Sequence, residues 1–264
     1  KFLKLLGLGS FSLCFGCHSA KYFSLKRDCD EPKKDQKRIR VMSFNIANVR
    51  GNNDDFFDTQ PVEKVKHNLD WIVSAVRNYD IDVVCLNEVD FNSARTNNIN
   101  MAQYIADNLC YEHAISENMF SLPLVLEIGN AVISRYPLKI NLHRQYGKEL
   151  FDRAQNMFKS FLDFDILLDN GKKLNIILTH LHNSEEKIRC EQARTLRNHL
   201  QTKRNPFVLL GDLNSTPEGK CFQNIIEDNF VSNPYLGQLT YPSALPRTEI
   251  DYILVSSGLS ITDY

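Results

Sequence analysis

Carboxylate, amide and imidazole side chains stand at the ends of several apolar segments of this sequence. The clearest case is the run Phe207 to Leu210, which stops at Gly211 and is followed by Asp212 and Asn214. A short apolar run bounded by turn formers predicts a buried strand, whose alternation should bring Asp212 and Asn214 to one side. A carboxylate at the edge of an apolar layer is costly unless it meets a metal, a cation or hydrogen-bond donors. The segment therefore predicts a polar ligand site, although a plain strand-to-helix turn uses the same residue types.

Four other predicted strands carry a polar side chain at or near one end. These strands, at about 39–46, 81–88, 174–180 and 249–255, carry Asn45, Glu88, His180 and Asp251. Singly, each has an ordinary structural explanation, such as a salt bridge for Glu88. Together they are hard oxygen donors with one imidazole, a set that suits Mg²⁺ better than zinc. Phosphoryl transfer needs a cation, a group that activates water and donors for the nonbridging oxygens, and this set can supply each.

The elements that would position these side chains alternate between strands and helices. Apolar residues at helical spacing predict one helix that begins at Pro61 and another over about Met101 to Leu109. The dipeptide Asn170-Gly171, between two alternating segments, predicts an antiparallel hairpin. Because strand, helix and strand follow one another without a repeat or a long linker, residues 39–264 are predicted to form one α/β domain.

The N-terminal segment differs in kind from the rest of the chain. Lys1 and Lys4 precede an apolar run from Leu5 to Gly16, which predicts a signal peptide over residues 1–20 and a charged linker over residues 21–38. We therefore expect an exported protein, either secreted, periplasmic or anchored to a membrane as a lipoprotein acylated at Cys17. The alternative is an apolar helix that packs on the domain.

The amino-acid composition says less about possible binding partners than the polar residues at the strand ends do. A hydrophobic content of 43% allows a large core, and a formal net charge of -1 provides no overall field to steer a polyanion. Any nucleic-acid or phospholipid binding must then depend on local patches. Cys85 is predicted to be a buried apolar residue, and the candidates for disulfide pairing in an oxidising compartment are Cys29, Cys110, Cys190 and Cys221.

Six motifs resemble those of the endonuclease/exonuclease/phosphatase superfamily, which includes DNase I-like nucleases, neutral sphingomyelinases and inositol polyphosphate phosphatases. They are Ser-Phe-Asn-Ile (43–46), Leu-Asn-Glu-Val (86–89), Gly-Asn-Ala-Val-Ile-Ser-Arg-Tyr-Pro (129–137), Thr-His-Leu (179–181), Gly-Asp-Leu-Asn (211–214) and Ile-Asp-Tyr-Ile (250–253). The resemblance covers residues from about 39 to the end. It implies a four-layer α/β sandwich with two central mixed β-sheets flanked by helices. It also implies metal-dependent hydrolysis of a phosphate ester, in a nucleic acid or in a phospholipid or phosphoinositide head group. We expect a monomeric enzyme.

The resemblance also implies a role for individual residues. Glu88 would bind Mg²⁺, with Mn²⁺ or Ca²⁺ as alternative ions, and Asn45 would stand beside it as a second metal residue. Asp212 would activate or orient the attacking water, and Asn214 would hold the phosphate or the metal. His180 would donate a hydrogen bond to a phosphate oxygen.

Two further implications concern Arg153 and Asp251. Arg153, in Asp152-Arg153-Ala154, would contact the phosphate. Asp251 would orient a second histidine in a Ser-Asp-His motif on a later strand, and this motif is not found after Asp251. We therefore expect about thirty further residues in the natural product, since closing the sandwich requires a pairing partner. The alternative function is a catalytically impaired phosphate- or nucleic-acid-binding protein of the same fold.

Overall fold

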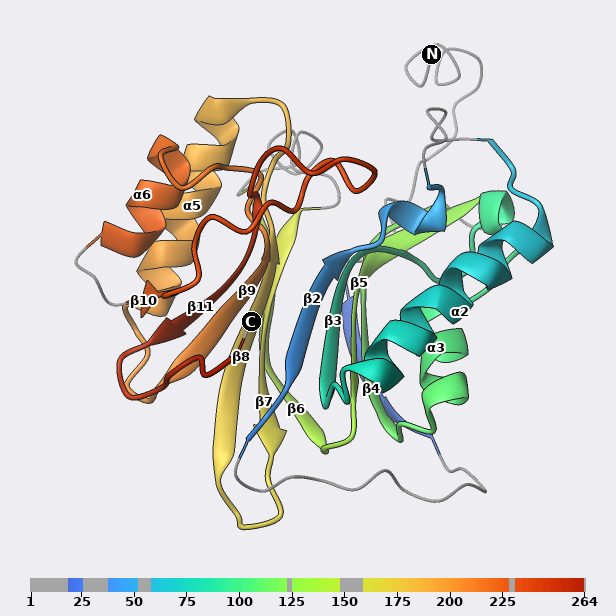
Figure 1. Ribbon diagram of the computed structural model, residues 1–264, viewed down its shortest axis with the longest axis horizontal. Helices are drawn as coiled ribbons and strands as arrows, with labels where there is room; N and C mark the ends of the chain where they lie inside the picture. The colour runs from blue at the N-terminus through green and yellow to red at the C-terminus, as the bar shows by residue number, and fades with distance from the viewer. Residues whose placement is uncertain are drawn as a thin grey trace.

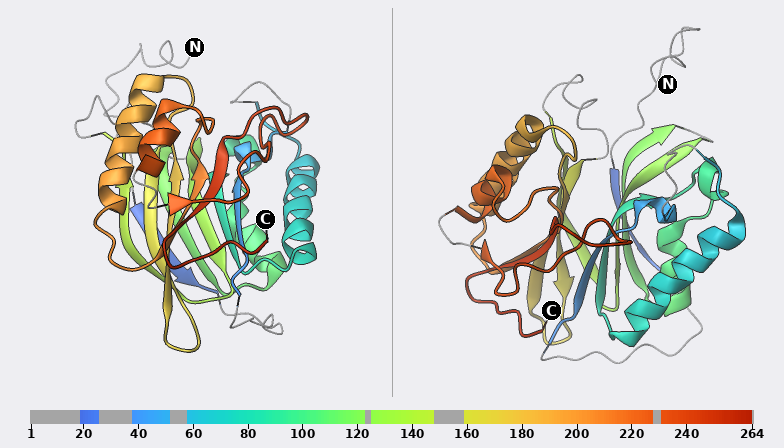
Figure 2. Two further views of the ribbon diagram at one scale, coloured as in Figure 1. Left: turned by 60° about the vertical axis from the view of Figure 1, so that its left-hand side comes forward. Right: turned by 45° about the horizontal axis from the view of Figure 1, so that its top comes forward.

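Two β-sheets lie face to face in the centre of the molecule, and helices cover the outer face of each sheet (Figure 1). The computed structural model describes residues 19–25, 38–51, 58–122, 125–147, 159–227 and 231–263. Figure 2 shows the same layers from two further directions. The predicted four-layer α/β sandwich is confirmed.

The first sheet has five strands in the order β1-β4-β5-β3-β2. Their bounds are Ser19–Ser24 (β1), His113–Leu122 (β4), Leu126–Ser134 (β5), Val83–Asp90 (β3) and Val41–Asn45 (β2). Strands β2 and β3 are parallel, and helix α2 (Val62–Asn78) connects them. Helix α3 (Met101–Leu109) packs beside α2, and both helices occupy the positions predicted from their apolar spacing. Two short 3-10 turns, η1 (Ala47–Val49) and η2 (Ala94–Thr96), follow β2 and β3.

The second sheet has six strands in the order β10-β11-β9-β8-β7-β6. Their bounds are Val231–Ser232 (β10), Asp251–Ser256 (β11), Phe207–Asp212 (β9), Lys173–His180 (β8), Ser160–Leu167 (β7) and Leu138–Gln145 (β6). Helix α5 (Glu186–Leu200) connects the parallel pair β8 and β9, and α6 (Lys220–Ile226) packs beside it. Asn170 and Gly171 form the predicted hairpin turn between the antiparallel strands β7 and β8.

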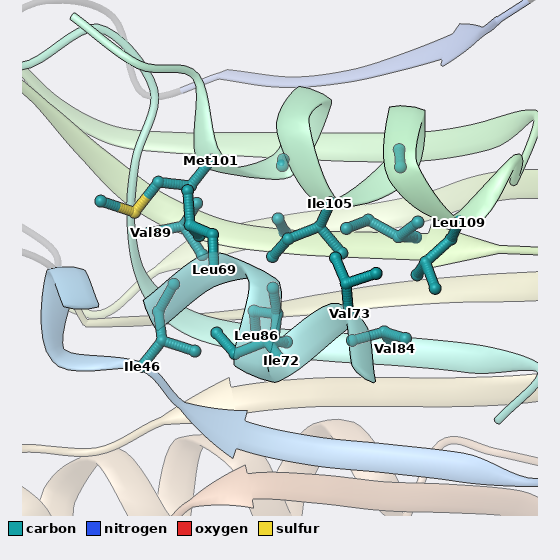
Figure 3. Close-up of a cluster of buried hydrophobic side chains, with 14 of the residues drawn as sticks. Ile46, Leu69, Ile72, Val73, Val84, Leu86, Val89, Met101, Ile105 and Leu109 are labelled. Carbon is teal, nitrogen blue, oxygen red and sulfur yellow. The ribbon is translucent and has the colours of Figure 1, made fainter. Parts of the chain in front are cut away.

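Alternation along the strands divides the apolar core into layers. In β3, Val84 and Leu86 pack under α2 and α3, whereas Val83 and Cys85 face the other sheet. Figure 3 shows the outer layer, where side chains of both helices meet those of β3. In β9, Val208 and Leu210 face inward by the same rule. Among the side chains that face the space between the sheets, those at one end of the strands are polar.

Three parts of the fold differ from the predictions or were missed by them. Residues 19–24 form edge strand β1, paired with β4, where the sequence predicts the end of a signal peptide and the start of a linker. Tyr22 of this strand donates or accepts a hydrogen bond with His113, and Phe23 packs on the outer core layer. Strands β4 and β6 and the short strand β10 were not predicted. No helix within the described ranges is long and apolar enough to cross a membrane.

A disulfide joins Cys190 of α5 to Cys221 of α6, two of the four cysteines that were expected to pair. Cys110 is also disulfide-bonded, and Cys29 lies outside the described residues. Cys85 is a free, buried cysteine, as predicted, and burial raises the pKa of its thiol. The bridge fastens the two helices that cover the second sheet.

Candidate active site

Four of the predicted site residues lie in the inward register of their strands, at the same end of the two sheets. His180 is two residues beyond Leu178 and Asp212 is two beyond Leu210, and both leucines belong to the core between the sheets. Asn45 ends β2, and Asp251 begins the antiparallel strand β11 and is paired with Asp212. The period-two alternation that builds the inter-sheet core therefore also delivers these four side chains to one edge.

Glu88 reaches the same edge through a β-bulge. The register of β3 against β5 shifts between Leu86 and Val89, and Glu88 lies in the shifted stretch with a φ of 54°. The Asn48 side chain holds this backbone, because its Nδ2 donates to the Glu88 carbonyl at 2.7 Å and to Asp90 Oδ1 at 3.2 Å. Bulges re-aim side chains next to active sites, and a left-handed glutamate is a strained conformation that its surroundings must maintain.

The side chains from the two sheets are in contact at this edge. Asn45 Nδ2 donates to Glu88 Oε1 at 3.3 Å and to Asp212 Oδ2 at 2.9 Å. His180 Nε2 lies 3.8 Å from Glu88 Oε1 and 3.7 Å from Asp212 Oδ2. Four of the six residues grouped by strand position, Asn45, Glu88, His180 and Asp212, thus form one cluster.

Lys159 is a member of this cluster that the sequence reading missed. Its Nζ lies 2.5 Å from His180 Nε2, and the side chain is buried. Burial lowers the pKa of Lys159, and the nearby carboxylates of Glu88 and Asp212 oppose that shift. Lys159 directly precedes β7, whose first residue pairs with His180. Its signal in the sequence is its place at the start of an antiparallel strand, whereas the side chains predicted for the site stand mainly where strands end.

Burial and the contact with Lys159 determine the protonation state and the tautomer of His180. Burial, and then the charge of Lys159, hold the pKa of His180 well below its usual value. A neutral imidazole that accepts from Lys159 through Nε2 carries its proton on Nδ1, and Nδ1 has no hydrogen-bond partner among the described residues. In this tautomer Lys159 donates to His180 Nε2. The hydrogen bond from His180 to a phosphate oxygen, which the resemblance implies, stays a prediction.

Asp212 and Asp251 form a cross-strand pair of carboxyl groups. Burial, and then the charge of Asp251, raise the pKa of Asp212 to about 7. Burial also raises the pKa of Asp251, whose side chain is hydrogen-bonded to Thr240. Like charges on directly opposed residues disfavour ionisation of both. Asp212 can therefore exchange a proton near neutral pH.

Gly211 allows β9 to approach β8 beside the cluster. It has a φ of +129°, and a Cβ atom there would lie 2.0 Å from the carbonyl oxygen of Thr179. The next turn places the backbone N–H of Asn214 2.8 Å from Asp212 Oδ1, while Asn214 Nδ2 donates to the Leu181 carbonyl at 2.9 Å. Asn214 thus meets Asp212 through its backbone, and its side chain secures the loop after β8.

The remaining candidates have other positions. Arg153 lies outside the described residues. His182, two residues after His180, accepts through Nδ1 from the backbone N–H groups of Ser184 and Glu185, so it organises the turn before α5. A grouping of Glu186 with Cys190 and Cys221 has metal-ligand spacing, but the two sulfurs are bonded to each other and are not free ligands.

The donor set of the cluster fits a hard divalent cation, and Asn45 fits it only after a rotation of its side chain. Glu88 and Asp212 present carboxylate oxygens, which Mg²⁺ prefers. Asn45 turns its amide nitrogen toward both carboxylates, and its Oδ1 accepts from the Ala47 N–H at 3.0 Å. Glu88 can therefore bind a cation as it stands, whereas Asn45 would have to turn its amide over.

Comparisons with solved structures agree with this architecture. An endonuclease/exonuclease/phosphatase protein from Beutenbergia cavernae matches with a TM-score of 0.62 and 20% identity, over 83% of this chain and 64% of its own, so this chain spans less than two thirds of that protein. The human Nocturnin catalytic domain with bound sulfate matches at 0.58 and 17%, over 83% and 82% of the two chains. Sphingomyelinase C from Streptomyces griseocarneus matches at 0.51 and 19%, over 73% and 76%. At these identities the likeness shows the fold.

A search of curated proteins found no significant match. A family model, described as the Endonuclease/Exonuclease/phosphatase family, matches residues 42–264. This range includes every residue of the cluster. The chain therefore belongs to the endonuclease/exonuclease/phosphatase family, whose members act on phosphoesters.

Proposed function

We propose that the protein is a Mg²⁺-dependent phosphodiesterase whose active centre is the cluster of Asn45, Glu88, Lys159, His180 and Asp212. The observation that carries the proposal is the meeting of hard oxygen donors and one ammonium at the edge of two sheets, in a chain of this family. Carboxylates suit a divalent cation, and an ammonium suits a phosphate oxygen.

Glu88 would hold the cation, joined by Asn45 once its amide has turned over. A bound divalent cation supplies positive charge that stabilises the charge developing on the phosphoryl group. Mn²⁺ and Ca²⁺ remain alternatives to Mg²⁺, since carboxylates and amides serve all three.

Asp212 would act as the general base. Without a bound cation its pKa is about 7, in the range for proton transfer near neutral pH, and the Asn214 N–H orients its Oδ1. Asp251 tunes this group because its negative charge helps to raise the pKa.

Lys159 would donate to a nonbridging phosphate oxygen. The neutral His180 would hold the ammonium in place through Nε2. Donors aimed at charge that develops in the transition state stabilise it most when they are already oriented in a site shielded from water, and both side chains are buried.

Two carboxylate variants test this division of roles. In Glu88→Gln the cation is held less tightly, so higher Mg²⁺ should restore part of the lost rate by mass action. Asp212→Asn should stay slow at every Mg²⁺ concentration, since more cation does not replace a base. The measurement is the rate of hydrolysis of bis(para-nitrophenyl) phosphate across a Mg²⁺ titration. Equal rescue of both variants would show that the assignment is wrong.

The family includes enzymes for different phosphate esters, and we propose no single substrate. We also propose that the protein works in an oxidising compartment, as an exported protein. The Cys190–Cys221 disulfide supports this, because such bonds persist outside reducing compartments. Cell fractionation with a compartment-specific thiol probe would test it, and finding the protein only among reduced, intracellular proteins would contradict it.

A further inference from the structure

A group of polar side chains lies between the two sheets and is joined to the cluster through a hydrogen bond with the backbone of Asp212. Its members are Asn87, Glu117, Asn130 and Ser160, on β3, β4, β5 and β7, and all four have 0% exposed area. We call this group the inter-sheet network. It lies in the same layer as the apolar residues that fill the space between the sheets, where a polar group is costly unless it is hydrogen-bonded. Polar side chains in that layer therefore need an explanation other than packing.

Each amide of the inter-sheet network donates through its nitrogen on the side nearer Glu117 and accepts through its oxygen on the opposite side. Glu117 Oε2 accepts from Asn130 Nδ2 at 2.8 Å and from the Ser160 hydroxyl at 3.0 Å. Because Asn130 turns its nitrogen to Glu117, its Oδ1 faces Asn87 and accepts from Asn87 Nδ2 at 2.8 Å. The Oδ1 of Asn87 is thereby turned outward.

The chain of hydrogen bonds ends at the proposed base. Asn87 Oδ1 accepts from the backbone N–H of Asp212 at 3.3 Å, across the two sheets. A second branch ends beside the ammonium, because Ser160 directly follows Lys159 and its carbonyl accepts from Thr179 Oγ1 at 3.1 Å. Thr179 in turn directly precedes His180.

An amide side chain can offer either its oxygen or its nitrogen, so a string of amides alone has no preferred direction. A carboxyl oxygen that accepts from both neighbours removes this freedom at one end. The direction set at Glu117 is the one that presents an acceptor, and not a second donor, to the N–H of Asp212.

We propose that Glu117 is a positioning residue for the proposed active centre, acting through Asn130 and Asn87 on the backbone of Asp212 and through Ser160 on Lys159. This inference rests on the proposed function. It assigns no contact with substrate to the network, and its effect is on how accurately Asp212 and Lys159 are held.

The first experiment disrupts the series of hydrogen bonds and then restores its donor-to-acceptor direction. In Asn130→Asp, the introduced carboxylate faces the carboxylate of Glu117, so the link between them is broken. In the double variant Glu117→Gln with Asn130→Asp, the glutamine amide donates to the carboxylate introduced at position 130, and this carboxylate still accepts from Asn87 Nδ2. The carboxyl group has moved by one position, and the direction of the branch through Asn130 and Asn87 is restored, with volumes almost unchanged.

The measurements are kcat and KM for bis(para-nitrophenyl) phosphate at saturating Mg²⁺, well below the melting temperature, together with Mg²⁺ binding by calorimetry. Asn130→Asp should lower kcat about 10- to 100-fold, because a small misplacement of reacting groups costs this much. KM and Mg²⁺ affinity should stay near those of the wild type, and the double variant should recover most of kcat. A network that only supports the fold would leave kcat per folded molecule unchanged in Asn130→Asp, and that result overturns the inference.

If Asn130→Asp does not fold, the near-isosteric Glu117→Gln variant tests the inference instead. Its glutamine can point either way, so both directions become populated and kcat should fall several-fold. A kcat equal to that of the wild type would overturn the inference. Failure of the proposed function is separate, since it would appear as a wild-type protein without Mg²⁺-dependent hydrolysis.

Discussion

Replacing Gly211 by alanine should damage both stability and activity, because the backbone of β8 lies directly against this residue. A Cβ atom at Gly211 would lie 2.0 Å from the Thr179 oxygen and 3.0 Å from its carbon. Both atoms belong to the backbone of β8, so the overlap can be relieved only by moving a strand. The residue also has a φ of +129°, which a side chain strongly disfavours.

The cost of the substitution has two parts. A positive φ in a non-glycine residue costs about 1–2 kcal/mol, and overlap in a packed interior costs about 1–3 kcal/mol. The sum, about 2–5 kcal/mol, corresponds to a drop in Tm of roughly 4–20 °C at about 2–4 °C per kcal/mol for a domain of this size. Activity should fall about 100-fold, because Asp212 follows Gly211 and pairs with His180.

Gly171→Ala is the matched control. Gly171 has a φ of +77°, but no atom lies within 4 Å of its added Cβ. This variant should show only the conformational cost of about 1–2 kcal/mol and keep full activity. Thermal melts followed by circular dichroism, with hydrolysis rates at low temperature, measure both effects. If Gly211→Ala is no less stable and no less active than Gly171→Ala, the close approach of β8 and β9 has no role in placing Asp212.

Three other substitutions have defined outcomes. Lys159→Met should lower kcat about 100-fold through loss of a donor to the phosphate, while Lys159→Arg keeps part of the rate; equal kcat in the Met and Arg variants would contradict the role of the charge. Asp163 is buried on the outer face of β7. Burial alone would raise its pKa, but hydrogen bonds from His199, Asn175 and Lys203 outweigh burial and lower it. Its contribution to the free energy of unfolding is therefore present above the unfolded pKa of 3.8 and is lost as pH falls below it. Asp163→Asn should cost about 3 kcal/mol at neutral pH and flatten this acid dependence in urea melts; an unchanged acid limb would contradict the assignment. Replacing Cys190 and Cys221 by serine should cost about 3–4 kcal/mol and leave kcat unchanged, since the bridge joins α5 and α6 away from the cluster; an equally stable variant would show that the bridge does not constrain the unfolded chain.

The inward side chains at strand ends were predictable because one physical rule serves both the core and the site. Alternation in β8 and β9 marks Leu178 and Leu210 as inward-facing, and the same count reaches His180 and Asp212. The rule needs no knowledge of tertiary contacts. By the same count, Asn45 in β2 and Asp251 in β11 lie in the inward register.

Alternation along a strand does not explain the positions of Lys159 and Glu88. Lys159 stands before β7, and only the antiparallel pairing of Ser160 with His180 brings it to the cluster. Glu88 points into the site because of a bulge and a left-handed φ, which depend on Asn48 from another segment. Similarly, residues 19–24 become a strand only by pairing with β4, far along the chain. Long-range pairing decides each of these cases.

The most direct test of the proposed centre is hydrolysis of bis(para-nitrophenyl) phosphate by the wild-type protein, with Mg²⁺ and with excess chelator, alongside calorimetric titration of Mg²⁺. The proposed function predicts Mg²⁺ binding, weaker binding in Glu88→Gln, and hydrolysis that the chelator abolishes and added Mg²⁺ restores. Equal rates with Mg²⁺ and with chelator, or Mg²⁺ binding that Glu88→Gln leaves unchanged, would contradict a cation-dependent centre in which Glu88 holds the cation.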